Sequence, residues 1–350
     1  MTGSEIVLEV KDLTVSFPTE DGLVRAVRGV SYDLRQGEVL GIVGESGSGK
    51  SVTSKAVMGL LPGSAKVGGS VRFRGQELIG APEKELQAVR GGRIAMVFQD
   101  PMTSLNPVYP VGDQIAEAVL AHNDVSVAAA RDRAVELLTM MQIPRARERA
   151  RDYPHEFSGG MRQRVVIATA MANDPDVIIA DEPTTALDVT VQAQVLEALE
   201  TARSATNAAM VLITHDLGVV AGTADRVLVM YAGRPVELGD VDDIYYEARM
   251  PYTLGLIGSL PRLDTARRGD RLVPITGSPP SLLDLPPGCP FAPRCPLRRE
   301  QCDELEPDVL ATSSPDHLAA CHFSAELAGR RPEDVFVATS ADPETAGGRS

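Results

Sequence analysis

Short runs of apolar residues, separated by glycine and polar turns, fill the first hundred positions and predict β-strands. Alternating apolar and polar positions at 6–10 and 13–17 predict two strands, and residues 24–34 predict a further strand pair. Together these segments predict an antiparallel patch. It precedes a mostly apolar run at 38–43, which predicts a buried strand. Shorter strands are predicted at 70–75 and 93–98.

The pattern changes to a helical period beyond this region. Residues 112–122 and 125–141 carry apolar side chains at i, i+3 and i+4, which predicts a helical insertion. The arginine-rich tract at 145–151 is typical of a solvated helix face. Buried strands return at 177–182 and 210–215, so the insertion separates two halves of an α/β core.

The most specific motif follows the strand at 38–43 and precedes a predicted helix at 52–60. Residues 44–51 match the phosphate-loop pattern G-x-x-x-x-G-K-[ST] at every fixed position. Its glycines let backbone N–H groups point at phosphate oxygens, and the helix N-terminus adds a positive dipole end. Lys50 would reach the β- and γ-phosphates, and the Ser51 hydroxyl would ligate Mg²⁺. The alternative, a glycine-rich turn that matches by chance, is disfavoured by the strand–loop–helix context. The predicted nucleotide-binding residues here are Gly44, Glu45, Ser46, Gly47, Ser48, Gly49, Lys50, Ser51 and Val52.

Polar residues end three of the predicted strands, where a parallel sheet would bring them together. Asp181 is expected to hold Mg²⁺ through water, and Glu182 to polarise the water that attacks the γ-phosphate. Gln99 is expected to bind Mg²⁺ or orient a water, and His215 to act beside them. Each has an ordinary alternative: a solvated acidic pair, a polar loop residue or a structural histidine. Their convergence favours a catalytic set.

Two further features are candidates for nucleotide contact. Ser158, Gly159 and Gly160 precede a predicted helix at 161–171 and would offer a hydroxyl and free N–H groups to an anion. Taken alone they are equally typical of a helix cap. Phe17 would stack on adenine or belong to the core of its sheet, and its position in the sequence favours neither.

The composition limits the classes of protein. The net charge of −14 argues against non-specific nucleic-acid binding, which requires a cationic surface. The 350 residues suggest two or three compact units, and 43% apolar content allows a sizeable core. The N-terminus lacks the pattern of a signal peptide, and no apolar run reaches the roughly 18–20 residues that cross a bilayer. We therefore expect a cytosolic protein that reaches a membrane only through a partner.

A cysteine cluster marks the C-terminal part of the chain. Its members are Cys289, Cys295, Cys302 and Cys321. The spacing C-x5-C-x6-C-x18-C differs from the paired C-x2-C of a zinc ribbon or bacterial ferredoxin. In a cytosolic chain such clustering favours an all-thiolate metal site over disulfides, with free thiols as the alternative. His317 and His322 flank Cys321 and would be substitute ligands.

Together these residues resemble the nucleotide-binding subunit of ABC transporters over about residues 5–250. The motifs occur in the family's order: a stacking loop at Phe17, Walker A at 44–51, a Q-loop at Gln99, a signature at 157–161, Walker B at 177–182, a D-loop ending at Asp188 and a switch histidine at His215. The signature departs from the consensus L-S-G-G-Q at Phe157 and Met161 and keeps Ser-Gly-Gly.

The resemblance implies an α/β fold, with a P-loop NTPase core (a RecA-like mixed sheet), an antiparallel β subdomain, a helical insertion at about 105–170 and a small Cys-rich C-terminal extension. The nucleotide-binding domain is expected at 1–262, the Cys-rich domain at 263–323 and a flexible tail at 324–350. The resemblance also implies that two such subunits close head to tail around two ATP molecules. Each ATP, with Mg²⁺ at Ser51, Gln99 and Asp181, would meet the other subunit's signature, and Asp188 would lie nearby.

Three further segments, 98–107, 251–254 and 288–296, are similar to the di- and oligopeptide importer group, which includes nickel importers. The resemblance implies an ATPase that energises peptide import at the cytoplasmic face of the inner membrane. Its partners would be two permease subunits, an extracytoplasmic peptide-binding protein and a second ATPase subunit, expected to be a paralogue. The alternatives are a nickel importer ATPase, an exporter or regulatory ATPase, or a soluble ABC ATPase acting on DNA or ribosomes. The acidity and the absence of a coiled-coil insert or second cassette disfavour the last.

For the cysteine cluster the resemblance suggests a 4Fe-4S cluster ligated by the four thiolates. Zinc and unliganded thiols remain the alternatives. A structural role is favoured over a redox role, because the segment has too little apolar content to build a core of its own.

Overall fold

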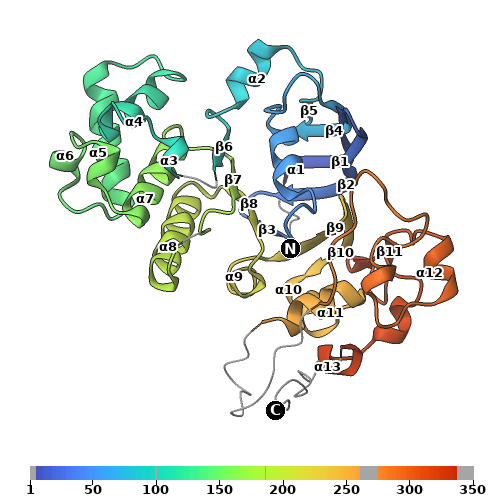
Figure 1. The fold of residues 1–350 in the computed structure, drawn as a ribbon. Coiled ribbons are helices and arrows are strands. Elements are labelled where there is room, and N and C mark those ends of the chain that lie inside the picture. The colour runs from blue at the N-terminus through green and yellow to red at the C-terminus, as the bar shows by residue number, and fades with distance from the viewer. Residues whose placement is uncertain (1–4, 99–100, 186, 261–274, 337–350) are drawn as a thin grey trace, which may run out of the picture. The chain divides into compact units, whose positions relative to one another are not determined.

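The computed structural model describes residues 5–98, 101–185, 187–260 and 275–336 of the chain (Figure 1). It consists of two compact units, residues 1–235 (unit 1) and 236–350 (unit 2). Gln99, one of the predicted catalytic residues, lies outside the described residues. In the part of the chain that the structure describes, no helix is long and apolar enough to cross a membrane. The predicted domain boundary near residue 262 stays a prediction.

Unit 1 contains an antiparallel sheet of order β2-β1-β4-β5, formed by β1 (Ile6–Thr19), β2 (Gly22–Arg35), β4 (Lys66–Phe73) and β5 (Gln76–Glu77). The prediction of two strands at 6–10 and 13–17 is wrong, as is the strand pair predicted at 24–34. Each segment is one strand. The pairing of β1 with β2 shifts register between Val10 and Leu13, where Asp12 has a φ of 47°. This irregularity absorbs the polar interruption, so the strand continues through it.

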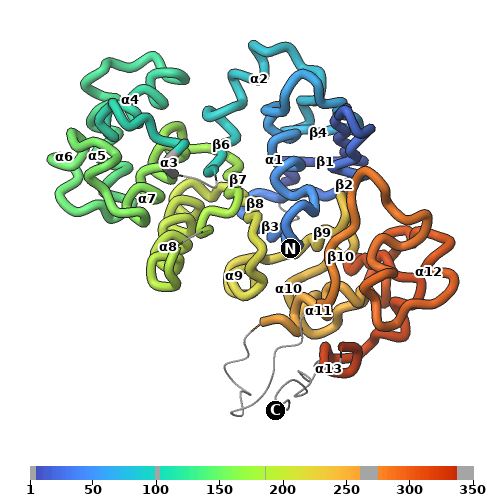
Figure 2. The backbone as a smooth tube through the Cα atoms, viewed as in Figure 1, coloured from blue at the N-terminus to red at the C-terminus, as the bar shows by residue number. Residues whose placement is uncertain are grey.

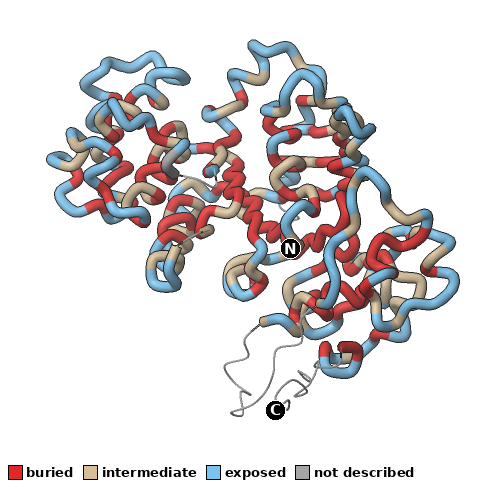
Figure 3. Tube along the Cα trace, in the orientation of Figure 1, coloured by how far each residue is buried: buried red, intermediate tan, exposed pale blue. Residues whose placement is uncertain are grey.

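Unit 1 also contains five neighbouring parallel strands, in the order β9-β3-β8-β7-β6. They are β3 (Val39–Val43), β6 (Ile94–Val97), β7 (Val177–Asp181), β8 (Ala209–Thr214) and β9 (Arg226–Tyr231). Every residue of β3, β7 and β8 is buried, which explains their continuous apolar runs (Figure 3). Because the strands are parallel, their carboxyl ends meet at one edge of the sheet.

The helices of unit 1 divide into those that follow strands and those of the insertion. The helices associated with the sheets are α1 (Lys50–Val57), α2 (Glu83–Val89), α8 (Val189–Thr206) and α9 (Leu217–Ala221). The insertion contains α3 (Pro101–Ser104), α4 (Val111–Leu120), α5 (Val127–Met140), α6 (Ala146–Arg149), η1 (Pro154–Glu156) and α7 (Gly159–Ala170), drawn in green in Figure 2. The helices predicted at 112–122 and 125–141 are confirmed as α4 and α5. Buried residues such as Ile115, Leu137 and Ile167 form one core with sheet residues.

Unit 2 is built mostly from short elements. They are β10 (Arg234–Asp240), whose first two residues belong to unit 1, α10 (Val241–Tyr246), α11 (Pro251–Gly258), η2 (Ala292–Arg294), α12 (Glu300–Glu304), β11 (Leu310–Ala311), β12 (Leu318–Ala319), η3 (Ser324–Leu327) and α13 (Pro332–Val335). Tyr252 and Phe291 pack edge to face with ring centroids 5.4 Å apart. The carboxylate of fully buried Glu237 on β10 forms a hydrogen bond with His317 at 2.8 Å. Side-chain contacts, more than regular sheet, hold this unit together.

Candidate functional site

The phosphate-loop motif 44–51 spans the connection from β3 to α1 and the first two residues of α1, and its backbone turns around the Lys50 side chain. Lys50 Nζ donates to the carbonyl oxygens of Gly44 at 2.7 Å and Glu45 at 3.0 Å. Only 4% of Lys50 is exposed, and burial lowers the pKa of its ammonium while Glu182 and Asp181 oppose that shift. The lysine is therefore held inside the loop by weak neutral acceptors, which a phosphate would outcompete.

Two glycines of this loop lie where no side chain fits. Gly44 has a φ of 150°, and a Cβ there would lie 2.2 Å from the Met230 carbonyl oxygen. Gly49, at a φ of 99°, would place a Cβ 2.5 Å from the Ala26 carbonyl oxygen. The pattern of glycines is thus a requirement of close backbone packing, in addition to any need to approach a ligand.

A polar corner forms where α1 meets the end of β7. Ser51 Oγ donates to Asp181 Oδ1 at 2.8 Å. Asp181 is 3% exposed, and burial raises the pKa of its carboxyl despite that hydrogen bond. Hydroxyl and carboxylate oxygens are ligands that Mg²⁺ prefers, so the donor set fits this ion. The predicted ligands Ser51 and Asp181 are brought together, and the third, Gln99, is outside the described residues.

Glu182 follows Asp181 and points to the end of the next strand. Its backbone has a φ of 47°, and its N–H donates to the Ile213 carbonyl at 2.9 Å. One carboxylate oxygen accepts from Thr185 Oγ1 at 2.9 Å and lies 3.7 Å from His215 Nδ1. Glu182 is mostly buried, whereas the His215 side chain is 61% exposed. The unusual backbone turns the carboxylate towards the histidine, which the sequence placed only at a strand end.

Thr185 is a functional candidate that sequence reasoning missed. Its hydroxyl fixes the orientation of the Glu182 carboxylate. A hydroxyl three residues after a strand-end glutamate was the available signal, because side chains at this spacing meet in a turn.

The Ser-Gly-Gly segment begins α7. Ser158 is exposed and caps the helix, accepting from the Met161 N–H at 3.4 Å. Gly160 is buried, and a Cβ there would lie 2.4 Å from Val191. In Figure 1, α7 lies to the left of β7 with the insertion helices, whereas α1 lies to the right. The structure therefore does not bring this segment to its own phosphate loop.

The two remaining residues predicted to contact the nucleotide, Phe17 and Asp188, lie on the surface of unit 1. Phe17 pairs with Val24 near the end of the β1–β2 ribbon. Its side chain is half-buried, so it is neither a core residue nor fully exposed to solvent. Asp188 is exposed and caps α8, accepting from the Val191 N–H at 3.0 Å. Both lie on accessible surface, as a nucleotide or partner contact requires.

A wide groove of about 910 Å³ lies in unit 1 and was not identified as a cavity from the sequence. Among the described residues it is lined by Leu60, Phe98 and Tyr109, by residues 104–106, and by side chains of α4 and α7. Leu60, Phe98 and Tyr109 are 41%, 39% and 57% exposed. Large apolar side chains exposed in a groove are typical of a docking surface.

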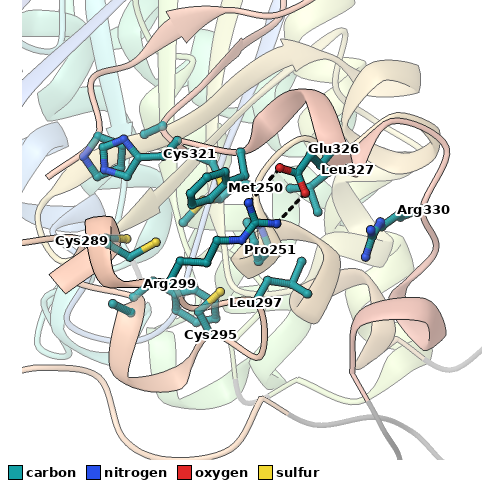
Figure 4. A pocket seen from close by; sticks show the side chains of 17 residues that line it. Met250, Pro251, Cys289, Cys295, Leu297, Arg299, Cys321, Glu326, Leu327 and Arg330 are labelled. Carbon is teal, nitrogen blue, oxygen red and sulfur yellow. Dashed lines mark hydrogen bonds and ion pairs between the residues drawn. The ribbon is translucent and has the colours of Figure 1, made fainter. Parts of the chain in front are cut away.

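In unit 2 all four cysteines line one cavity of about 40 Å³, hereafter the thiol cavity (Figure 4). One water needs roughly 10–15 Å³ on this measure, so the cavity has room for a larger compact group. Burial raises the pKa of Cys295 to about 12 and of Cys321 to about 11, and neighbouring thiols act in the same direction. Among the described residues, no three His, Cys, Asp or Glu side chains already surround the position of a single metal ion.

Comparison with known proteins gives two family matches. The model of the ABC transporter family matches residues 27–185, and that of the oligopeptide/dipeptide transporter C-terminal region matches residues 236–302. The dipeptide transport ATP-binding protein of Bacillus subtilis is 55% identical over 326 residues, covering 93% of this chain and 96% of that protein. The oligopeptide transport ATP-binding protein of Escherichia coli is 51% identical over 92% of this chain and 95% of its own length.

The oligopeptide transport ATP-binding protein of Mycobacterium tuberculosis is 57% identical over 98% of this chain, which spans 56% of that protein's length. Among solved structures, a dimeric ATP-binding cassette in a post-hydrolysis state with ADP and Pi matches with a TM-score of 0.60 and 27% identity. That match covers 67% of this chain and 98% of the cassette. The predicted α/β P-loop NTPase fold of the core is thereby confirmed.

Proposed function

The chain belongs to the ABC transporter family of ATP-binding proteins, in the group with the oligopeptide/dipeptide transporter C-terminal region, and we propose that it hydrolyses ATP to energise import of di- or oligopeptides. The observation that carries the proposal is the corner at which Lys50, Ser51 and Asp181 converge beside Glu182. The relatives' names supply the peptide class.

In this mechanism the chain's own residues do most of the work by position. Lys50 and the loop N–H groups bind the phosphates, and Ser51 and Asp181, with Gln99, would hold Mg²⁺. The ion, when bound, neutralises charge on the phosphates. Glu182, oriented by Thr185, takes a proton from the attacking water. His215 would act from the neighbouring strand end beside Glu182.

We propose that two ATPase subunits complete each other's sites. The support is that the chain has one phosphate loop and one Ser-Gly-Gly segment, on different sides of β7 in Figure 1. The solved cassette that this chain resembles is dimeric. Whether the second subunit is identical or a paralogue is read from the composition of the native complex.

The test of hydrolysis is Glu182→Gln, with Glu197→Gln on exposed surface of α8 as the matched control. Loss of the general base should lower the turnover rate by roughly 10²- to 10⁴-fold and leave ATP affinity unchanged. The variant should also accumulate an ATP-bound dimer on size exclusion. Hydrolysis by Glu182→Gln at the rate of the control contradicts the assignment.

The groove in unit 1 is our candidate for contact with the permease subunits, which would hold the chain at the cytoplasmic face of the inner membrane. Tyr109→Arg should reduce co-purification with the permease pair, because a buried charge would replace an aromatic contact. Val125→Arg, at an exposed apolar residue outside the groove lining, is the control. Equal recovery of permease with both variants would remove the groove from consideration.

Uptake measurements on the complete transporter complex identify the transported substrate. With an extracytoplasmic binding protein present, we expect ATP-dependent uptake of labelled peptide and no stimulation by Ni²⁺. The reverse result identifies a nickel importer. ATP hydrolysis that no permease or binding protein affects identifies a soluble ABC ATPase.

We also propose a 4Fe-4S cluster in the thiol cavity. Four thiols around one cavity fit its donor set. Burial raises the pKa of Cys289, Cys295 and Cys321, which favours their neutral form unless a cationic centre compensates. The alternative ligand is a single zinc ion. With Zn–S bonds of about 2.3 Å in tetrahedral geometry, it would hold the four sulfur atoms about 3.8 Å from one another. Iron and acid-labile sulfide in anaerobically purified protein test this, and zinc without iron overturns it.

A further inference from the structure

Among the residues that line the thiol cavity, Arg299 contacts two others, Phe323 and Glu326. It is the residue before α12, the helix that contains Cys302, and its carbonyl accepts from the Cys302 N–H at 2.8 Å. Its guanidinium donates to both Glu326 oxygens, at 2.9 and 2.6 Å. The same guanidinium lies 3.9 Å from the centroid of the Phe323 ring. Figure 4 shows Arg299 among Cys289, Cys295 and Cys321, directed at Glu326.

The two partners of Arg299 come from a different part of the chain. Phe323 and Glu326 follow Cys321 by two and five residues, whereas Arg299 precedes Cys302 by three. The contacts therefore fasten the Cys302 segment to the Cys321 segment. All three side chains also line the cavity itself.

We propose that Arg299, Phe323 and Glu326 form a clamp that closes the thiol cavity and controls access of solvent and thiol-reactive molecules to it. In one respect the clamp rests on the proposed function: it would shield a bound 4Fe-4S cluster from solvent. It also stands without a cluster, because it would equally protect the free thiols from oxidation.

The chemistry of the clamp requires arginine. A planar guanidinium can pair with both oxygens of one carboxylate while its face rests on an aromatic ring. A lysine at 299 would satisfy one contact at a time. Arg299 and Glu326 are about half exposed, at 49% and 48%, so the pair forms the outer wall of the cavity. Of the four cysteines, Cys289 and Cys302 are buried, at 8% and 9% exposed, and Cys295 and Cys321 are partly exposed.

The neighbouring Arg298 offers a matched control. It pairs with Asp303 at 2.7 Å and is 51% exposed, but it does not line the cavity. Removing either arginine takes one positive charge from the surroundings of the thiols. Loss of charge alone disfavours thiolate and slows alkylation, so faster alkylation reports opening of the cavity.

The experiment measures the rate at which iodoacetamide alkylates the four cysteines of the reduced full-length chain after iron chelation. Arg299→Gln should react roughly three- to thirtyfold faster than wild type, the factor expected when a surface ion pair and a cation–π contact are lost. Arg298→Gln should react at the wild-type rate or more slowly. Rates for Arg299→Gln at or below those for Arg298→Gln overturn the clamp.

Phe323→Leu is the second variant, which changes no charge and tests the same closure should Arg299→Gln fail to fold. It should also alkylate faster than wild type, and an unchanged rate contradicts the clamp. Where the purified chain contains iron, both clamp variants should release it faster in air than Arg298→Gln. A chain without iron whose alkylation still follows this order retains the clamp and loses the cluster. A chain with iron whose rates do not differ retains the cluster and loses the clamp.

Discussion

The phosphate corner of unit 1 and the thiol cavity of unit 2 are built in different ways. In unit 1, buried parallel strands place each polar group at a strand end, and backbone contacts set the loop around Lys50. In unit 2, the cysteines come from loops and short helical turns, and side-chain contacts such as that of Arg299 with Glu326 hold the segments together. We therefore expect backbone changes to damage the first region most, and side-chain changes to open the second.

Of the changes that test this comparison, Gly44→Ala should have the largest effect. A Cβ at Gly44 would lie 2.2 Å from the Met230 carbonyl oxygen, so the loop must move by a substantial part of an ångström. Displaced N–H groups would lose hydrogen bonds to the charged phosphates, each contributing about 1.5–3 kcal/mol, so ATP binding should weaken by up to about a hundredfold. Gly47→Ala, where nothing lies within 4 Å, is the control for left-handed backbone strain alone. Equal ATP affinities for the two variants, measured by calorimetry, would show that backbone packing does not set this site.

The corresponding change in unit 2 is Gly288→Ala. A Cβ there would lie 2.2 Å from the Cys302 carbonyl oxygen, which accepts from the Cys289 N–H at 2.7 Å. Separation of these two cysteines should accelerate alkylation by roughly tenfold or more, since local opening frees both thiols. ATP affinity should stay at the wild-type value. A loss of ATP binding would break the comparison, because the two regions would then not be independent.

A smaller effect concerns pH and the buried carboxylate of unit 2. Burial is the main cause that raises the pKa of Glu237, with His317 opposing it. Between the unfolded and the higher folded pKa, the folded state binds more protons, so stability falls as pH rises through this window. Glu237→Gln should remove this decline, which is at most about 1.4 kcal/mol per pH unit. Chemical unfolding between pH 4.5 and neutrality measures it.

Glu300→Gln, at an exposed residue of the same unit, is the control for that experiment and should keep the wild-type slope. Parallel stability curves for Glu237→Gln and wild type would mean that the buried pair carries no net proton linkage.

The smallest effect should come from Phe17→Leu. Phe17 is half-buried, so stacking of its ring on adenine should add only modestly to ATP affinity. Loss of the ring should therefore raise the apparent KM for ATP roughly two- to tenfold. Phe17→Tyr should restore the wild-type value, because the ring is kept. An unchanged KM for Phe17→Leu assigns the side chain to the sheet instead.

Much of unit 1 could be predicted because its signals are local. The match at 44–51, the apolar runs that became β3, β7 and β8, and the helical period of α4 and α5 each depend on residues close in sequence. Strand ends such as Asp181 and His215 then follow from the rule for parallel sheets. The same local reasoning divided β1 and β2 wrongly, because pairing across the register shift at Asp12 comes from a neighbouring strand.

By itself, the sequence determined the order of the elements, the phosphate loop and the set of polar residues that meet at the sheet edge. These depend on backbone conformation and on periodicity, which short stretches of chain encode. Only the tertiary structure decided that the Glu182 carboxylate lies beside His215, that the four cysteines share a cavity and that Arg299 lies across Phe323 and Glu326. Such contacts join segments whose spacing in the sequence has no period, so they exist only once the chain has folded.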